Sequence, residues 1–250
     1  KGYANINTDS MLSLDMHIPV GENISGVIPE LTGQFGFGPA AVGVNLGLSY
    51  ANPDSELVDG GAWFGNIALF GKGRHCIDLG GTKACFGGQL EVSIAPMKAD
   101  DAEDAVAISF GTLNDLRLAG RFSSEMLVFT PTLGFQLLHD MFYAQVYMGP
   151  EVIVYLNDDV AEFMGDDVDS ALIYGFAGGV NILGLVSAGV GFRGNSTLSF
   201  PDNDSAYAFD IMAQLHLPFV KPYLMLSIPM DEDSRDALDI SLTLGAAAVF

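Results

Sequence analysis

The uncharged stretch at residues 170–192, SALIYGFAGGVNILGLVSAGVGF, decides the fold. It is long enough to cross a bilayer as a helix. It contains six glycines, however, and each glycine in a helix interior costs about 1 kcal/mol relative to alanine. The stretch also alternates on both sides of Leu183–Gly184, which is suited to a tight turn. We therefore predict a hairpin of two β-strands, in which Leu172, Tyr174, Phe176, Val180 and Ile182 face one way and Gly175, Ala177, Gly179 and Asn181 face the other.

The same period of two recurs along most of the chain. A soluble β-sandwich alternates too, but many of these segments have 11 or more residues, a length that suits a strand tilted across a bilayer. From residue 40 onward the pattern predicts twelve strands, and fourteen is the alternative number. The twelve predicted strands are 40–50, 61–71, 85–96, 104–111, 115–122, 126–138, 141–156, 170–182, 184–196, 206–219, 221–230 and 237–250.

The connections between these predicted strands are of two kinds. On one side most are short, at Asn114-Asp115, His139-Asp140, Leu183-Gly184 and Val220-Lys221. On the other side most are longer or acidic, at 51–60, 97–103, 157–169, 199–205 and 231–236, with the short link at 123–125 as an exception. A sandwich has no reason to sort its loops in this way, whereas an outer-membrane barrel does. The sequence thus predicts an all-β fold, a transmembrane antiparallel up-and-down β-barrel with a polar interior.

The composition agrees with a protein that faces lipid. Hydrophobic residues make up 49% of the 250 residues, and only 16% are charged although the formal net charge is -21. The ten Lys and Arg residues are scattered, which argues against nucleic acid as a partner, because phosphate binding needs clustered basic residues.

Cys76 and Cys85 lie close together, with two glycines between them. This spacing favours a disulfide across a small loop and therefore an oxidising compartment. Two free thiols are the alternative. A zinc site is disfavoured because His75 is the only further ligand nearby and there is no second cysteine pair.

The last predicted strand carries a resemblance to a known family. In residues 236–250, DALDISLTLGAAAVF, one face is formed by Leu238, Ile240, Leu242, Leu244, Ala246, Ala248 and Phe250, and the other by Asp239, Ser241, Thr243 and Gly245. A final amphipathic strand that ends in Phe resembles the C-terminal insertion signal of bacterial outer-membrane β-barrel proteins, the porin-like superfamily. Phe250 is the insertion-signal residue in this comparison.

The resemblance implies a place in the Gram-negative envelope. The C-terminus would lie in the periplasm, together with the short turns and the Cys76–Cys85 loop, and the acidic loops would lie outside. The implied partners are outer-membrane lipid and lipopolysaccharide, and the barrel-assembly machinery during insertion, while a homo-oligomer or an envelope protein partner stays open. Residues 40–250 are expected to form the barrel, and residues 1–39 an N-terminal plug or periplasmic segment, with one strand at 11–20 as an open alternative.

The predicted register also assigns an inner face. The candidate pore-lining residues are Glu91, Arg117, Arg121, Gln136, Tyr143, Gln145, Tyr147, Arg193, Asp210, Gln214, Lys221 and Asp239. These residues either line a water path that selects solutes or pair across the lumen and fill a narrow barrel. The first interpretation is a porin-like channel or transporter for small solutes, which prefers cations because its mouths are acidic. The second is a structural barrel that anchors envelope or surface partners.

Catalysis has little support in the sequence. None of the four histidines stands in a His-x-Ser pair, and Gly-x-Ser-x-Gly is absent. The weaker alternative of a lipid-modifying enzyme therefore rests on His139 and His216 only. The acidic segment after Leu156 contains carboxylates that suit Ca²⁺ or Mg²⁺, but it lacks EF-hand spacing, and a solvated surface loop is the favoured interpretation. We expect no metal, no cofactor and no enzymatic activity.

Overall fold

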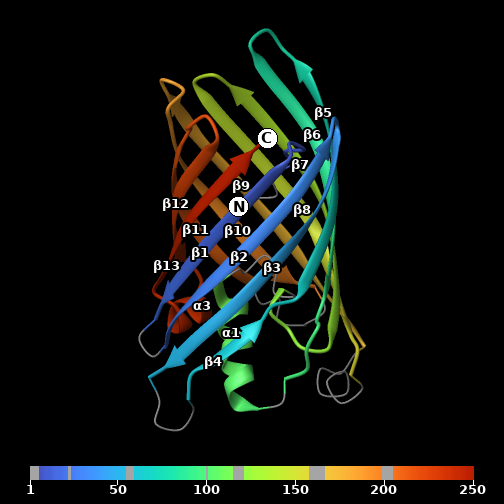
Figure 1. Ribbon diagram of the computed structural model, residues 1–250, viewed down its shortest axis with the longest axis vertical. Coiled ribbons are helices and arrows are strands. Elements are labelled where there is room, and N and C mark those ends of the chain that lie inside the picture. The colour runs from blue at the N-terminus through green and yellow to red at the C-terminus, as the bar shows by residue number, and fades with distance from the viewer. Residues whose placement is uncertain are drawn as a thin grey trace.

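The alternating segments form antiparallel strands that close into a barrel (Figure 1). The computed structural model describes residues 6–21, 24–54, 59–99, 101–114, 121–157, 167–198 and 205–250. Within these ranges twelve strands form the ring, and the short strand β4 is an extra one, which pairs with β3 beyond the part of β3 that pairs with β5. The strands are β1 Met11–Val20, β2 Ile24–Phe37, β3 Ala40–Pro53, β4 Gly61–Phe64, β5 Ile67–Asp78, β6 Thr82–Ile94, β7 Met126–His139, β8 Phe142–Tyr155, β9 Val168–Ile182, β10 Val186–Thr197, β11 Ser205–Leu215, β12 Val220–Pro229 and β13 Ile240–Val249.

The two faces of each strand differ as the sequence pattern predicted. On β7, for example, Thr132 points inward and is 6% exposed, while its neighbour Leu133 points outward and is 72% exposed. A closed barrel has no free strand edge, so its backbone groups are paired within the wall even where the outer surface is apolar. The outward leucines, valines and phenylalanines therefore form a surface suited to lipid.

Residues 170–192 form the predicted hairpin. Strands β9 and β10 pair along their whole length, and Leu183 and Gly184 join them with φ angles of 53° and 67°. Two consecutive residues with positive φ make the type I′ turn that matches the twist of a hairpin. The described part of the chain has no helix long and apolar enough to span a membrane.

The structure corrects the expectation for residues 1–39. Most of this segment is wall and not plug, because β1 pairs with β13 on one side and with β2 on the other, and β2 pairs with β3. Both strands are needed to close the ring between β13 and β3. The alternation in residues 11–20 was a genuine strand signal, and the strand 24–37 was missed.

The predicted strand at 104–111 is wrong, and the described part of the predicted strand at 115–122 forms no strand. Residues Ala102–Asn114 form helix α1 instead, and Asp101 caps its first turn by accepting a hydrogen bond from the Asp104 N–H at 3.0 Å. Residues 115–120 lie outside the described ranges, and Arg121 and Phe122 belong to no strand. The total of twelve is nevertheless correct, since β1 and β2 replace these two strands in the ring.

The two ends of the barrel differ in their connections. At the end that we call the turn end, uppermost in Figure 1, short turns at 38–39, 79–81, 140–141, 183–185 and 216–219 join the strands. At the opposite loop end lie the long connections, including the one from residue 95 to residue 125, which carries α1, and the one that carries the short helix α3, Glu232–Ala237. The predicted sorting of loops is confirmed except at Asn114-Asp115, because Asn114 is the last residue of α1 in the long connection at the loop end. The short link at 123–125 belongs to the same connection.

The predicted disulfide is confirmed. Cys76 and Cys85 are bonded and lie directly opposite each other on the β5–β6 hairpin, whose tip carries Gly80 and Gly81 with positive φ. The bridge therefore links two strands that already pair, near the turn end.

Candidate functional site

The inner wall of the barrel is polar over most of its length. Among the described residues, six inward carboxylates are almost fully buried, and a buried carboxylate needs a partner to offset its lost hydration. The contacts of these groups therefore determine how the interior is organised. They are Asp15, Glu30, Glu91, Glu151, Asp169 and Asp210.

An ionic network near the loop end ties the connection after α1 to the wall. Arg121 donates two hydrogen bonds of 3.0 Å to the carboxylate of Glu91 on β6, one from Nε and one from Nη2. Its Nη1 lies 3.5 Å from Glu30 on β2, and Glu30 is also 3.6 Å from Nε2 of His17 on β1. A fork of two parallel bonds is the strong geometry for arginine and carboxylate. One arginine thus links a loop to two separate parts of the barrel wall.

A second network lies on three neighbouring strands. Arg193 on β10 places Nε 3.2 Å from Asp210 on β11 and donates from Nη2 to Ser227 on β12 at 3.0 Å. The Ser227 hydroxyl donates in turn to Asp210 at 2.5 Å. Arg121 and Arg193 therefore both stand beside carboxylates that balance their charge.

Inward tyrosines lie flat against glycines of the neighbouring strands. A Cβ atom built on Gly189 would stand 2.3 Å from Oη of Tyr143, and one on Gly245 would stand 2.4 Å from the ring of Tyr223. Only glycine leaves room for rings in these positions, so the rings cover the wall and do not cross the lumen. Tyr223 also donates a hydrogen bond to Asp15.

A cavity of about 500 Å³ occupies the lumen towards the turn end. Its volume is within the usual range of small-molecule sites. Polar side chains from several strands line it, among them the pair Gln136 and Gln145, whose amides are hydrogen-bonded at 3.1 Å. The charged side chains of its lining are Asp9, Arg74 and Lys221.

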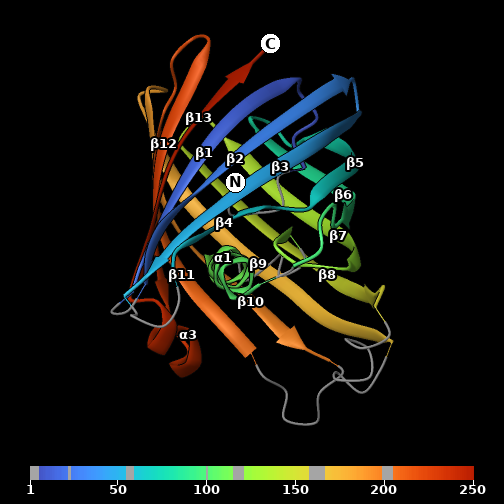
Figure 2. The ribbon, with the colours of Figure 1, turned by 60° about the horizontal axis from the view of Figure 1, so that its bottom comes forward.

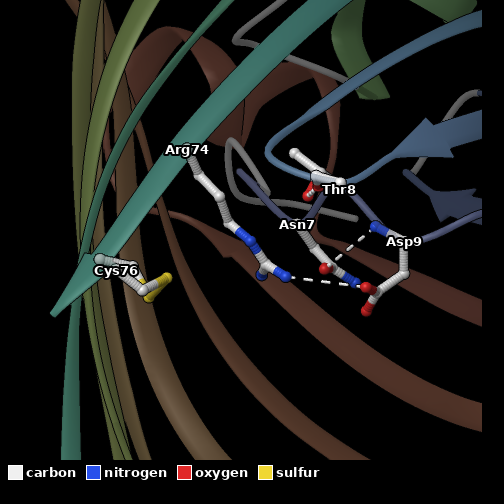
Figure 3. Close-up of a disulfide and its surroundings, with 7 residues drawn as sticks. Asn7, Thr8, Asp9, Arg74 and Cys76 are labelled. Atoms are coloured by element: carbon white, nitrogen blue, oxygen red, sulfur yellow. Dashed lines mark hydrogen bonds and ion pairs between the residues drawn. A yellow bond between two sulfur atoms is a disulfide. The ribbon is translucent and has the colours of Figure 1, made fainter. Parts of the chain in front are cut away.

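The first described residues lie along the inner wall beside this cavity (Figure 3). Gln34 on β2 donates to the carbonyl groups of Asn7 and Asp9 at 2.9 and 2.6 Å, and Thr8 donates to the carbonyl of Gly38 at 2.8 Å. Arg74 reaches Asp9 at 3.6 Å, near the disulfide. Residues 6–10 thus narrow the turn end from inside.

Helix α1 narrows the loop end (Figure 2). It packs against β3 and β4, and its Phe110 joins Trp63, Ile28 and Phe122 in a buried apolar cluster. Ile28 is an inward residue of β2, so this cluster sits inside the mouth of the barrel and not on its outer surface. The lumen is therefore partly closed at both ends by its own chain.

Most of the predicted lining residues take inward positions. Arg121 also reaches the interior, although it does so from a loop. Arg117 lies outside the described residues, and Asp239 is exposed at the loop end just before β13. Those on inward strand positions are Glu91, Gln136, Tyr143, Gln145, Tyr147, Arg193, Asp210, Gln214 and Lys221.

Sequence reasoning missed the interior residues of β1 and β2. Asp15, His17 and Glu30 are buried or half-buried inside the barrel, but residues 1–39 were not expected to form its wall. The period-two pattern of residues 11–20 was the available signal for Asp15 and His17.

The histidines do not form a catalytic arrangement. Nε2 of His216 lies 2.5 Å from the Ser187 hydroxyl, which donates to Oδ1 of Asn181 at 2.6 Å. The Ser187 hydroxyl has a single proton, which it donates to Asn181. The hydrogen atom between Ser187 and His216 therefore belongs to Nε2 of His216, so this histidine is not placed to accept a proton from Ser187. Burial, and then the charge of Lys221, lower the pKa of His216. His139, which also lies at the turn end, accepts a hydrogen bond from the Met141 N–H at 3.1 Å.

No metal cluster is present in the part of the chain that the structure describes. Most of the acidic segment after Leu156, residues 158–166, lies outside the described ranges.

Comparison with known proteins gives the fold class. No model of a known protein family matches the sequence. A search of curated proteins finds no relative. Solved structures do match: an outer-membrane channel from Pseudomonas putida has a TM-score of 0.64 and 7% identity, over 99% of this chain and 98% of that one. The KdgM porin in complex with disordered oligogalacturonate has a TM-score of 0.51 and 10% identity, over 95% of this chain and 99% of that one.

These similarities define the class of protein. The chain has the fold of the bacterial outer-membrane β-barrels, and the predicted resemblance to that class is confirmed. Outer membrane phospholipase A from Escherichia coli matches at a TM-score of 0.39 and 10% identity, over 96% of this chain and 92% of that one. At identities this low, the similarity extends to the fold alone.

Proposed function

We propose that this barrel is an outer-membrane channel for small solutes. The observation that carries the proposal is the unfilled polar lumen, in which tyrosine rings lie against glycines and leave a cavity of about 500 Å³. A barrel of this strand number stands between small filled barrels and wide porins. Its interior therefore suits a narrow path and not a wide water-filled pore.

The proposal includes a preference for cations. Arg121 and Arg193 in the lumen are balanced by carboxylates, so they contribute little net positive potential. The chain as a whole has a formal charge of -21, and the loop end carries exposed acids such as Asp54, Asp59 and Glu103. A mouth with a negative potential concentrates cations. We further propose that this loop end faces outward and the turn end, with the C-terminus, faces the periplasm.

The test is single-channel conductance of the refolded protein in a planar bilayer with asymmetric KCl. We expect steady openings and a reversal potential that favours K⁺. A reversal potential that favours Cl⁻ would reject the cation preference and keep the channel. A silent barrel, shown to be folded by its heat-dependent mobility on a gel, would reject the channel itself.

The alternative is a closed structural barrel that anchors envelope partners. The observation in its favour is the loop-end mouth, where α1 and Phe122 pack against the inner wall. It predicts a silent bilayer and an envelope protein that co-purifies in mild detergent. Purification as a lone protein with steady openings would exclude it.

A further inference from the structure

The inward faces of β11 and β12 are layered along the barrel axis. The two strands are adjacent and antiparallel, so their inward residues meet in pairs across the ladder. The layer of two methionines lies between polar layers, and a second apolar pair, Ala208 and Pro229, follows nearer the loop end. From the turn end inward, the layers are Lys221, the pair Gln214 and Tyr223, the pair Met212 and Met225, and the pair Asp210 and Ser227.

Lys221 gives the turn-end cavity an unbalanced positive charge. Arg74 and Asp9, the other charged groups of the lining, form an ion pair at 3.6 Å. Within the described ranges, no carboxylate stands within ion-pair distance of Lys221. An unpaired cation in the lumen of a chain with a formal charge of -21 is a natural site for an anion. Its ammonium group offers three hydrogen-bond donors.

Neutral donors line the same cavity as Lys221. Gln214 and Tyr143 line the same cavity, and neither side chain has a hydrogen bond to another described residue. An amide N–H and a phenol O–H can both donate to a carboxylate. The charged layer therefore has the groups to hold a carboxylate through more than one bond.

Met212 and Met225 provide the surface for an apolar body. Both point inward and line the cavity, directly opposite each other in the β11–β12 register. A methionine side chain is flexible and polarisable, so it adapts to ligands of different shape. At about 3.3 Å per residue, the Cα atoms of Lys221 and Met225 are separated by about 13 Å along β12. A short-chain carboxylate between them can touch the ammonium group at one end and the thioethers at the other.

We propose that the turn-end cavity binds small organic carboxylates with an apolar body, whose carboxylate contacts Lys221 and whose carbon chain contacts Met212 and Met225. The inference rests on the proposed channel, because carboxylates reach this cavity through the lumen. It concerns the turn end, where Lys221 carries a positive charge, whereas the cation preference is proposed from the acidic loop end. A simple inorganic anion would use Lys221 alone, and an alcohol would use the methionines alone. A ligand that uses both Lys221 and the methionines must therefore have a carboxylate and an apolar body.

Equilibrium dialysis of the full chain in detergent against radiolabelled hexanoate tests the site. Hexanoate has both features, gluconate has the carboxylate with hydroxyl groups, hexanol has the apolar chain alone, and chloride has the charge alone. We expect unlabelled hexanoate to compete at a concentration about tenfold lower than any of the other three. Hexanol lacks the charge-assisted bond, which is worth about that factor. Gluconate and chloride lack the apolar chain, and two buried CH₂ groups are worth about the same.

Variants assign the two halves of the site. Lys221→Gln should weaken hexanoate binding about tenfold. Lys98→Gln is the matched control, because it removes the same charge from a side chain that is 62% exposed near Glu125 at the loop end, and it should leave binding unchanged. Met225→Ser and Met212→Gln should each weaken hexanoate binding while leaving gluconate binding as it was. The heat-dependent gel mobility identifies any variant that fails to fold. If one methionine variant does not fold, the other still tests the apolar half of the site.

The possible results separate the proposal from the channel on which it rests. Chloride that competes as well as hexanoate, gluconate that competes equally, or unchanged binding in folded Lys221→Gln would each overturn the proposed site. Dialysis needs no open channel, so hexanoate binding by a barrel that is silent in bilayers would support the site and reject the channel. Conduction without hexanoate binding would support the channel and reject the site.

Discussion

Replacing Arg121 by alanine is the sharpest perturbation that the structure offers. Arg121 is the link between the connection that carries α1 and the barrel wall, through its fork to Glu91 and its contact with Glu30. The Arg121 side chain is 12% exposed and that of Glu91 is 2% exposed. Arg121→Ala would leave the two carboxylates buried without their shared cation.

The expected loss follows from this burial. Removing one partner of a buried ion pair costs about 3–5 kcal/mol. We take the lower value, because Asn66 still binds the segment, with its N–H on the Arg121 carbonyl at 2.7 Å and its side chain on Ser123 at 2.7 Å. A loss of about 3 kcal/mol raises the population of the undocked segment roughly a hundredfold.

Hydrogen exchange measured by mass spectrometry reports this docking directly. Peptides from α1 and from residues 121–125 should exchange faster in Arg121→Ala, while peptides from β9 and β10 should not change. Arg235→Ala is the matched control, since Arg235 is an exposed residue of α3 at the same end. Arg121→Lys should have an intermediate effect, because lysine keeps the charge and loses the fork.

A double-mutant cycle decides whether the pair is responsible. Adding Glu91→Gln to Arg121→Ala removes one stranded carboxylate, so the two losses should sum to more than the loss of the double variant. Unchanged exchange of α1 in Arg121→Ala, or strictly additive losses, would refute the role that we give to this network.

Three further predictions concern other parts of the barrel. Gly189→Leu should lower single-channel conductance, because its Cβ would stand 2.3 Å from Oη of Tyr143 and must push that ring into the lumen; unchanged conductance would count against the flat ring. Burial acts to raise the pKa of Asp231, but hydrogen bonds from the Tyr207 and Ser234 backbone N–H groups outweigh it and hold this pKa below the usual value. A depressed carboxyl pKa stabilises the fold above the unfolded value of about 4, so the protection of the α3 amides, relative to their intrinsic exchange rate at each pH, should fall as the pH falls below that value. Asp231→Asn should remove that pH dependence while keeping the cap, because asparagine caps helices about as well as aspartate. Reduction of the disulfide should increase exchange only at the tip of the β5–β6 hairpin, and a change in conductance would show that the bridge supports the lumen.

The wall of the barrel could be predicted from the sequence because period-two alternation survives wherever one face meets lipid. Strand β2 was missed because its inward face is not uniformly polar. Its inward Ile28 packs against Phe110 of α1, so an apolar side chain stands where the pattern required a polar one. The contact with α1 therefore interrupts the alternation by which β2 could have been recognised in the sequence.

Helix α1 was predicted as a strand for a related reason. Val106, Ile108 and Phe110 alternate within a short apolar run, and a run of this length does not distinguish strand from helix by period alone. The cap at Asp101 was the local signal for a helix. The total was unchanged because two strands were predicted between residues 104 and 122, while β2 was missed and β1 was kept only as an open alternative.

The sequence predicted which residues of the candidate site face the interior, but not which of them contact one another. Register alone places residues such as Glu91 and Asp210 on the inner face. The partners come from distant segments, with Arg121 and Glu30 separated by 91 residues and Ser187 and His216 by 29. Which inward residues meet depends on the order of the strands around the ring and on the path of the loops, and a single-strand pattern contains neither.

Thiol labelling of the inner wall tests the central claim most directly. The native cysteines are both in the disulfide, so one new cysteine is the only target under non-reducing conditions. Gln145→Cys places it on the inward face beside the cavity, and Val146→Cys places it on the outward face, where Val146 is 50% exposed. If the lumen is the solute path, a charged water-soluble thiol reagent will change the current through Gln145→Cys and leave Val146→Cys unaffected. An unaltered current through Gln145→Cys, with labelling verified by mass, would contradict it.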